Sequence, residues 1–574
     1  MKKLSFLIIW ISCFSTNLFA YTLYAFQYSY PGFLMASHRT SSGWDSPEYI
    51  TPYGAENCFG INICSSNSYD LSNYSILSWL SNPNQNSGLN FQLLEKNREE
   101  SYLSSINFPR MLENTNCAFT VDPVCHTGLF VFEKTEEENG KSISSLYYSY
   151  IDLSSPSPQW AEPKIIIKES DTFQFSSEFS LSAAKGSAVL VFTGTDYHSD
   201  LGPGIYIQKL DISNSIWSER HLVAKGELFQ PQVVYDGNDI LITFEEDSLK
   251  NTKAKIAIQT RNGFITLPEI LSETPFYKGS IPASPPRIAL KNGTALLAWV
   301  VTDPLSSNKR IQSGMIDLYA TQPSLQVLNG SAGPFLSAAD LDSNYVELSC
   351  DNDGNAIAVW LGVDKNKSQL VEAATFQKAH MFWSPTVDLT EKGKPGPSFY
   401  QDLAYPTVRT NSRGDTVVAW SWFNGLRNVI QVVQGNIQSD ISSWNINSKE
   451  IVSNSQYQSY CPQIALDEKG AISLSWISRD IYPPTNLCVT EDKIDNILWS
   501  ISSKSLKWDP SVSKSAVGYK IYRDNKVVGK VSGKTYKYSD SYISKIDKIQ
   551  YAVTAVDRLG NESVPQSISF EETK

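Results

Sequence analysis

The most regular polar feature of this sequence is a short acidic or amide side chain that lies four residues after a repeated aromatic residue. Carboxylate and amide oxygens at equivalent loop positions could together bind cations or the hydroxyl groups of a sugar. The same side chains accept backbone N–H bonds and fix turns, and this structural interpretation is the favoured one. The pattern occurs at Asp196, Asp303, Asp364, Asn424 and Asp480.

Two shorter motifs also match sequences with known chemistry. Residues 351–354 read Asp-Asn-Asp-Gly, like the start of a calcium loop, but the later ligands and the glutamate of a twelve-residue loop are missing. Residues 413–415 form an Arg-Gly-Asp tripeptide, yet Gly414 occupies a turn position of the repeat described below. We interpret both segments as hairpin turns, and an adhesive role for the tripeptide stays open.

Motifs for metal, nucleotide or nucleophilic chemistry do not occur. The histidines are scattered, and neither HExxH nor Cys-x-x-Cys spacing is found. There is no GxSxG segment, no phosphate loop and no GxGxxG after a strand. We therefore expect no metal and no cofactor, and the sequence identifies no catalytic residue.

The elements that position the loop residues form an internal repeat. A turn glycine is followed six residues later by an aromatic residue, and alternating apolar residues flank the turn, which predicts β-hairpins. The clear copies are Gly186 to Phe192, Gly293 to Trp299, Gly354 to Trp360, Gly414 to Trp420 and Gly470 to Trp476. Weaker copies start from another residue, at Asn73 to Trp79, His126 to Phe132 and Asn238 to Phe244.

Between the hairpins, an aromatic residue opens a short outer strand. Two inner strands, a third strand and this outer strand make up a propeller blade, which buries its faces only by stacking around an axis. We expect an all-β protein with a β-propeller of eight blades, or of seven if residues 50–115 are an insertion. The aromatic residues are Trp44, Trp160, Trp217, Trp383 and Trp444.

The two ends of the repeat are out of phase. The Trp44 strand precedes any hairpin, whereas the Gly470 hairpin has no clear outer pair before the period ends. We expect residues 21–50 to pair with the Gly470 hairpin, because this closes the ring and removes exposed strand edges. The alternative is that Trp499 opens a local outer strand for the last blade.

The hairpins resemble those of bacterial β-propeller repeat proteins, sialidases included, but the resemblance stops at the hairpins. A RIP segment is missing, because Arg287 and Ile288 are followed by Ala289. The nearest match to an SxDxGxxW box, residues 349–354, is out of register by one residue. Hydrolysis needs two positioned carboxylates or a tyrosine nucleophile with an arginine cluster, and no spacing here selects them.

The last part of the chain breaks the period and resembles a fibronectin type III domain. The matching segments are SLKWDPS, GYKIYRDNKVVGKV, YKYSD and IQYAVTAVDRLGNESVP. The resemblance makes Trp508 the core tryptophan of the second strand and Tyr551 the corner tyrosine of the sixth. The family's integrin-binding loop falls at residues 557–563, which lack Arg-Gly-Asp. The resemblance implies a β-sandwich that acts as a spacer or docking module.

Residues 1–20 have the pattern of a secretory signal peptide. Lys2 and Lys3 precede an apolar run that is too short to span a bilayer, and cleavage is expected after Ala20. The alternative is a lipid anchor at Cys13. We expect an exported protein, periplasmic, on the outer surface or secreted, with no transmembrane anchor after the signal. Its domains are the propeller, residues 21–481, and the sandwich, residues 482–574.

Export permits disulfide bonds. The spacing allows Cys58 to pair with Cys64 and Cys117 with Cys125, and either bond closes a short loop. The three later cysteines cannot all pair with one another, so at least one free thiol is expected, and an inert buried thiol is favoured over a nucleophile. These are Cys350, Cys461 and Cys488.

Composition narrows the function classes. With 41% hydrophobic and 19% charged residues in 574, the chain is globular rather than disordered or polytopic. Loss of two lysines with the signal peptide changes the net charge from -11 to -13, which argues against nucleic acid as a partner. We expect a non-catalytic binding protein whose propeller face docks a protein or glycan. The alternative is a propeller glycoside hydrolase.

Overall fold

The structure is a computed structural model of the chain. It describes residues 33–571 apart from loop segments, the longest of which are 51–57, 66–73, 82–88, 96–116, 276–285, 391–405 and 541–547. All named elements of the described residues are β-strands, so the predicted all-β class is confirmed. Among these residues, none forms a helix of the length and hydropathy that crossing a membrane requires.

Antiparallel sheets follow one another along the chain and are numbered here as blades. Blade 1 contains β4 (Cys58–Ser65), β5 (Tyr74–Ser81) and β6 (Leu89–Glu95). Blade 2 contains β7 (Cys117–Asp122), β8 (Thr127–Glu138), β9 (Lys141–Asp152) and β10 (Lys164–Lys168). Blade 3 contains β11 (Phe173–Ala184), β12 (Ser187–Asp196), β13 (Gly202–Asp211), β14 (Ile216–Trp217) and β15 (His221–Lys225).

The next four blades repeat this plan. Blade 4 contains β16 (Leu228–Tyr235), β17 (Ile240–Asp247), β18 (Asn251–Thr260), β19 (Gly263–Thr266) and β20 (Ser272–Pro275). Blade 5 contains β21 (Arg287–Lys291), β22 (Thr294–Thr302), β23 (Lys309–Asp317) and β24 (Gln326–Leu328). Blade 6 contains β25 (Asp342–Cys350), β26 (Ala356–Val363), β27 (Gln369–Gln377), β28 (Phe382–Trp383) and β29 (Val387–Asp388). Blade 7 contains β30 (Thr407–Thr410), β31 (Asp415–Phe423), β32 (Asn428–Asn436) and β33 (Glu450–Ile451).

Blade 8 joins the two ends of the repeat. Its strands are β34 (Gln458–Leu466) and β35 (Ile472–Arg479) from the Gly470 hairpin, with β1 (Phe33–Thr40), β2 (Gly43–Trp44) and β3 (Glu48–Tyr49) from the N-terminal segment. β1 pairs with β35, with Met35 opposite Trp476. The predicted pairing with the hairpin is thus confirmed for residues 33–39, and β2 and β3 belong to the same blade because they pair with β1.

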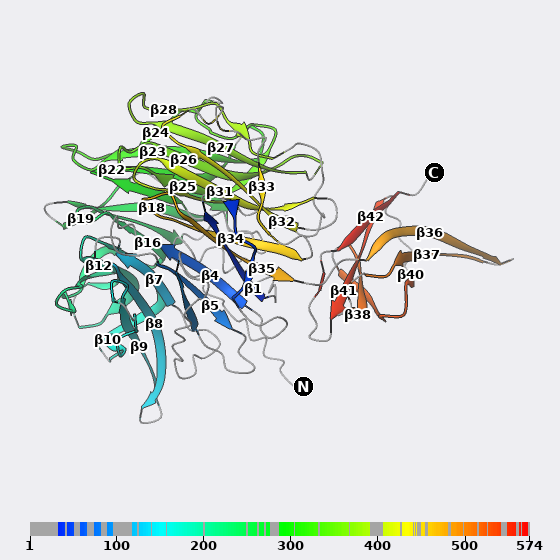
Figure 1. Cartoon of the computed structure of the whole chain (residues 1–574), viewed down its shortest axis with the longest axis horizontal. Coiled ribbons are helices and arrows are strands. Elements are labelled where there is room, and N and C mark those ends of the chain that lie inside the picture. The colour runs from blue at the N-terminus through cyan, green and yellow to red at the C-terminus, as the bar shows by residue number, and fades with distance from the viewer. Residues whose placement is uncertain are drawn as a thin grey trace.

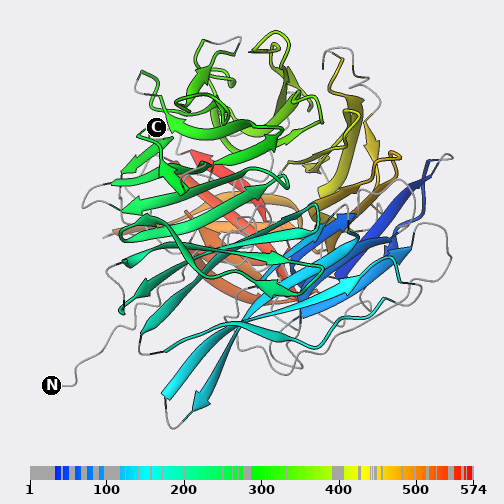
Figure 2. The same cartoon turned by 90° about the vertical axis from the view of Figure 1, so that its left-hand side faces the viewer.

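The eight sheets form a closed ring (Figure 1; turned by 90° in Figure 2). The innermost strands contact one another in the order β4, β7, β11, β16, β21, β25, β30 and β34, and β34 contacts β4. The chain therefore contains an eight-bladed β-propeller. The alternative of seven blades is wrong, because strands between residues 58 and 95 form a blade of their own.

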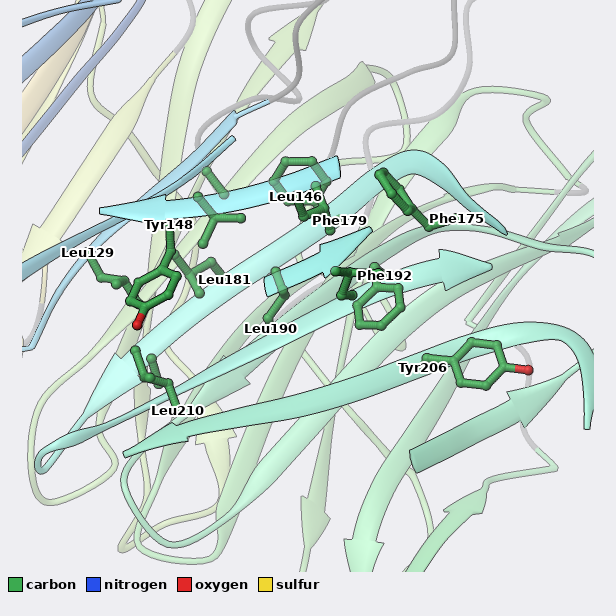
Figure 3. Close-up of a cluster of buried hydrophobic side chains, with 14 of the residues drawn as sticks. Leu129, Leu146, Tyr148, Phe175, Phe179, Leu181, Leu190, Phe192, Tyr206 and Leu210 are labelled. Carbon is green, nitrogen blue, oxygen red and sulfur yellow. The ribbon is translucent and has the colours of Figure 1, made fainter. Parts of the chain in front are cut away.

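The core lies between the blades, as the repeat predicts. The hairpin tryptophans are at most 1% exposed: Trp299, Trp360, Trp420 and Trp476. Figure 3 shows one such interface, where Leu129, Leu146 and Tyr148 of blade 2 meet side chains of blade 3. The described blades thus bury apolar side chains against their neighbours, as expected for units that are stabilised by stacking.

Two structural features explain why glycine recurs in the hairpin turns. Gly293 has φ +74° and Gly354 has φ +84°, in the left-handed region that L side chains rarely adopt. A Cβ at Gly293 would lie 2.3 Å from the Tyr319 ring, and one at Gly354 would lie 2.8 Å from the Lys378 side chain. In both blades a side chain that follows the third strand packs on the turn, so a Cβ there would have to displace it.

Polar side chains of one blade accept hydrogen bonds from backbone N–H groups on the inner strand of the next blade. Ser180 Oγ accepts the Val233 N–H at 3.1 Å, and Glu178 Oε2 accepts the Gln230 N–H at 2.7 Å. Both bonds join β11 to β16. Burial raises the pKa of Glu178 to about 7, and the bond from Gln230 opposes this shift. The inner strands are therefore capped across blade boundaries, where they have no ladder partner.

The C-terminal strands form two further sheets. One has the order β36 (Thr485–Asn496), β37 (Trp499–Asp509) and β40 (Lys537–Asp540). The other has the order β39 (Lys526–Ser532), β38 (Ala516–Arg523), β41 (Lys548–Asp557) and β42 (Gln566–Glu571). The alternative placement of the Trp499 strand in blade 8 is wrong, because β37 pairs with β36 and β40.

The core of this sandwich contains the two residues that the sequence singled out. Trp508 is 4% exposed, Tyr551 is fully buried, and both belong to one apolar cluster. The Tyr551 hydroxyl donates to Asp540 Oδ2 at 2.9 Å and so ties β41 to β40. Membership of the fibronectin type III family stays a prediction.

Candidate functional site

Strand register places the predicted loop residues on one face of the propeller. In blade 3, Asp196 pairs with Gly202 at one end of the ladder, and Ser187 pairs with Asp211 at the end next to Gly186. The loop between the second and third strands therefore opens opposite the glycine turn. We name the two sides the loop face and the turn face. Asp196, Asp303, Asp364 and Asn424 all follow second strands on the loop face, and Asp480 lies outside the described residues.

Asp303 holds its own loop in place. Its carboxylate accepts the Leu305 N–H at 2.9 Å and the Ser306 hydroxyl at 3.0 Å, and it pairs with Arg310 at 3.4 Å. The Leu305 N–H bond, followed by the contacts to Ser306 and Arg310, lowers the pKa of Asp303. Arg310 is buried and lies 4.1 Å from the centre of the Phe335 ring. The carboxylate thus serves the fold of the loop.

In two other loops the carboxylate also accepts backbone N–H groups of its own loop. Asp364 Oδ1 accepts the N–H groups of Asn366 and Ser368, both at 2.8 Å. Asp196 Oδ1 accepts the N–H of His198 at 2.9 Å. The structural interpretation of these residues is supported at each of the three sites, because the carboxylate closes an Asx turn.

The turns present apolar side chains on the loop face. Leu305, whose N–H is bound by Asp303, is 96% exposed, and Tyr197, which follows Asp196, is 60% exposed. The Tyr197 N–H donates to Thr172 O at 2.9 Å and its hydroxyl to Gln174 Oε1 at 3.2 Å. Both side chains are therefore exposed on backbone that is held by hydrogen bonds. The turn carboxylates were predicted from the sequence, whereas these neighbours were not, although their position one or two residues after an acid was the available signal.

The turn face explains the two short motifs. Asp351 Oδ1 accepts the N–H groups of Asp353 and Asn355, both at 2.9 Å, so it closes the hairpin turn. Arg413 pairs with Asp415 at 2.8 Å within the tripeptide. The two charges of the tripeptide thus form an ion pair with each other.

Hydrogen bonds between neighbouring turns were not predicted from the sequence. Asp122 Oδ2 accepts the N–H of Gly186, which joins blade 2 to blade 3. Asp236 Oδ2 accepts the N–H of Asn292 at 3.0 Å, which joins blade 4 to blade 5. The available signal was an Asp or Asn three residues before the turn glycine, found in three copies at Asp351, Asn411 and Asp467.

The strand geometry does not fit the two disulfides that the cysteine spacing allowed. Cys58 and Cys64 lie on the single strand β4, where six residues of extended chain separate the α-carbons by roughly 20 Å, well beyond the reach of a disulfide. Cys125 is a free, exposed thiol in a turn, whereas Cys117 pairs with Phe132 at the far end of the same hairpin. The extended strands hold the two cysteines of each pair apart, although they are close in sequence.

Of the later cysteines, Cys350 fits the expectation of an inert thiol, whereas Cys488 is exposed and does not. Cys350 and Cys488 are free thiols, as expected for at least one of the three. Burial raises the pKa of Cys350 to about 11, so it carries little thiolate at neutral pH. Across the described part of the chain, no three His, Cys, Asp or Glu side chains gather in a way that could hold a metal ion.

The comparisons with solved structures show similarity of fold alone. No family model and no curated protein matches the chain. The propeller of the Pyrococcus furiosus trilobed protease is 10% identical, with 69% of this chain and 98% of that chain covered and a TM-score of 0.36. Acylaminoacyl peptidase of Pyrococcus horikoshii is 9% identical, with 80% and 59% covered and a TM-score of 0.35. A Hadza microbial sialidase is 10% identical, with 66% of each chain covered and a TM-score of 0.33.

Proposed function

We propose that this chain is an exported, non-catalytic binding protein that docks a protein partner on its loop face. The observation that carries the proposal is Leu305, which is 96% exposed at the tip of a loop fixed by Asp303. A large apolar side chain on a fixed backbone loses little conformational entropy when a partner covers it. Tyr197 repeats the arrangement in blade 3.

The loop carboxylates support binding over hydrolysis. A glycosidase needs two carboxyl groups directed at the substrate, one of them able to carry a proton at working pH. Asp303 instead turns its oxygens toward Leu305, Ser306 and Arg310, and its pKa is lowered, so it stays ionised. Its chemistry is that of a turn and a buried ion pair.

Site-specific photo-crosslinking tests the proposal with a matched pair of tyrosines. Tyr197 on the loop face is 60% exposed and Tyr319 on the turn face is 67% exposed, and each hydroxyl binds one polar side chain. In the producing cells, Tyr197→p-benzoylphenylalanine should give a discrete protein adduct that is absent for the same change at Tyr319. Equal adducts from both faces would contradict the proposal. Turnover of fluorogenic glycosides by the purified chain would favour the hydrolase instead.

A further inference from the structure

The C-terminal sandwich differs in charge from the rest of the chain. From Thr485 to Lys574 the sequence contains 14 Lys and Arg against 11 Asp and Glu, a net charge of +3. Residues 1–484 contain the remaining 34 basic and 48 acidic residues, a net charge of -14. A basic module attached to an acidic one suggests a separate, anionic ligand for the module.

The exposed lysines of the sandwich gather along two edge strands. β39 and β40 are the terminal strands of their sheets, and a tight turn connects them. The Tyr538 hydroxyl donates to Val528 O, so the two edges lie together. We name the lysine edge after its exposed members, which are Lys526 and Lys530 of β39, Lys534 of the turn, Lys537 of β40, and Lys507 of the adjacent strand β37.

The arrangement has an electrostatic cost. Lys507 and Lys537 are direct partners in the pairing of β37 with β40, and both are exposed. Like charges opposite each other destabilise a sheet. Among the described residues, no carboxylate forms an ion pair with any lysine of the edge, whereas the nearby Lys520 pairs with Glu562. An anion bound along the edge would remove the repulsion.

An aromatic ring lies within the lysine edge. Tyr536 is 38% exposed, and it stands between Lys534 and Lys537 in the chain. Its ring packs edge-on against Tyr519, with centroids 6.0 Å apart, and its carbonyl accepts the Trp508 N–H at 3.1 Å. The ring is therefore fixed by the core of the sandwich while one part of it faces solvent.

We propose that the lysine edge binds an acidic polysaccharide, a glycan with carboxylate groups along its chain. Ammonium groups attract the carboxylates over the length of the edge, and the apolar face of a sugar ring can stack on Tyr536. A membrane fits less well, because stable binding to lipid combines basic residues with apolar side chains that reach roughly 5–10 Å into the headgroup region. The exposed apolar neighbours, Val517 and Val527, are short side chains on strands.

Oligogalacturonate is the probe, and the test uses the full mature chain. Its affinity is measured for a triple variant of the edge, Lys530→Gln, Lys534→Gln and Lys537→Gln. The matched control removes three exposed propeller lysines: Lys164→Gln, Lys365→Gln and Lys469→Gln. The edge variant should bind about tenfold more weakly or worse at low salt, and the control should bind like the parent. Tyr536→Ala should weaken binding without changing its salt dependence.

Three outcomes would overturn the proposal. The first is equal loss in both triple variants, which would indicate a general charge effect. The second is binding to vesicles of phosphatidylcholine with phosphatidylglycerol but not to oligogalacturonate, which would indicate a membrane ligand. The third is aggregation of the edge variant with unchanged affinity, which would show that the lysines only protect the strand edges.

Discussion

The indole Nε1 of Trp360 donates a hydrogen bond to Glu372 Oε2 at 2.7 Å, and both side chains are buried. The two residues are direct partners on β26 and β27. In blade 7, Trp420 makes the equivalent bond to its partner Gln431 at 3.1 Å. In blades 6 and 7 the third strand thus supplies the acceptor for the indole that the hairpin buries, whereas in blade 8 Trp476 donates to Ser478 of its own strand.

Removing the acceptor should destabilise blade 6. Glu372→Ala leaves the buried indole N–H of Trp360 unpaired and should lower the free energy of unfolding by about 1–3 kcal/mol. Glu372→Gln should cost less, because Gln431 plays this part in blade 7. Urea denaturation followed by tryptophan fluorescence measures both. Equal stability of Glu372→Ala and the parent would show that the bond contributes nothing.

The loop carboxylates should contribute different amounts to stability, because they have different partners. Asp303→Ala removes a turn acceptor and leaves the buried Arg310 without its carboxylate, whereas Asp364→Ala removes a turn acceptor alone. The first variant should therefore melt at a clearly lower temperature than the second. Calorimetry of the two variants measures this difference in melting temperature. A larger effect at Asp364 would be inconsistent with the structure.

Stability should depend on pH through Glu178. Its folded pKa of about 7 is raised above the ordinary 4.5, so its contribution is complete below pH 4.5 and is lost as the pH rises through 7. Glu178→Gln keeps an acceptor for Gln230 without the charge. This variant should exceed the parent in stability at pH 8, by up to about 3 kcal/mol, and match it at pH 4. The exposed control Glu162→Gln should show no such trend, and a pH-independent difference at Glu178 would refute the assignment.

The N-terminal strands should be essential to the ring. A chain that starts near residue 52 lacks β1, so β35 loses the partner that places Met35 opposite Trp476. It should melt well below a chain that starts at residue 21, because the open blade exposes a long apolar edge. Thermal unfolding of the two chains is the measurement. Identical melting temperatures would mean that the pairing does not hold the ring together.

Local sequence patterns predicted most of the blades, whereas contacts between blades could not be predicted from the sequence. The step from Gly354 to Trp360 lies within one hairpin, so sequence alone gives its turn and its buried ring. The count was ambiguous at blade 1, where Asn73 replaces the glycine. The bond from Ser180 to Val233 joins residues 53 apart and depends on how two blades stack. Cys58 and Cys64 were misjudged because a loop was assumed where a strand runs.

Binding through the loop face is most directly tested by affinity. The partner crosslinked at Tyr197 would be purified, and its dissociation constant measured for the parent, Leu305→Ser and the turn-face control Tyr319→Ser. Leu305 is 96% exposed and Tyr319 is 67% exposed, so either change should cost only a small part of the stability. A loss of about tenfold or more for Leu305→Ser with no change for Tyr319→Ser is the expected result. Unchanged affinity for Leu305→Ser, or a loss confined to Tyr319→Ser, would place the binding surface elsewhere.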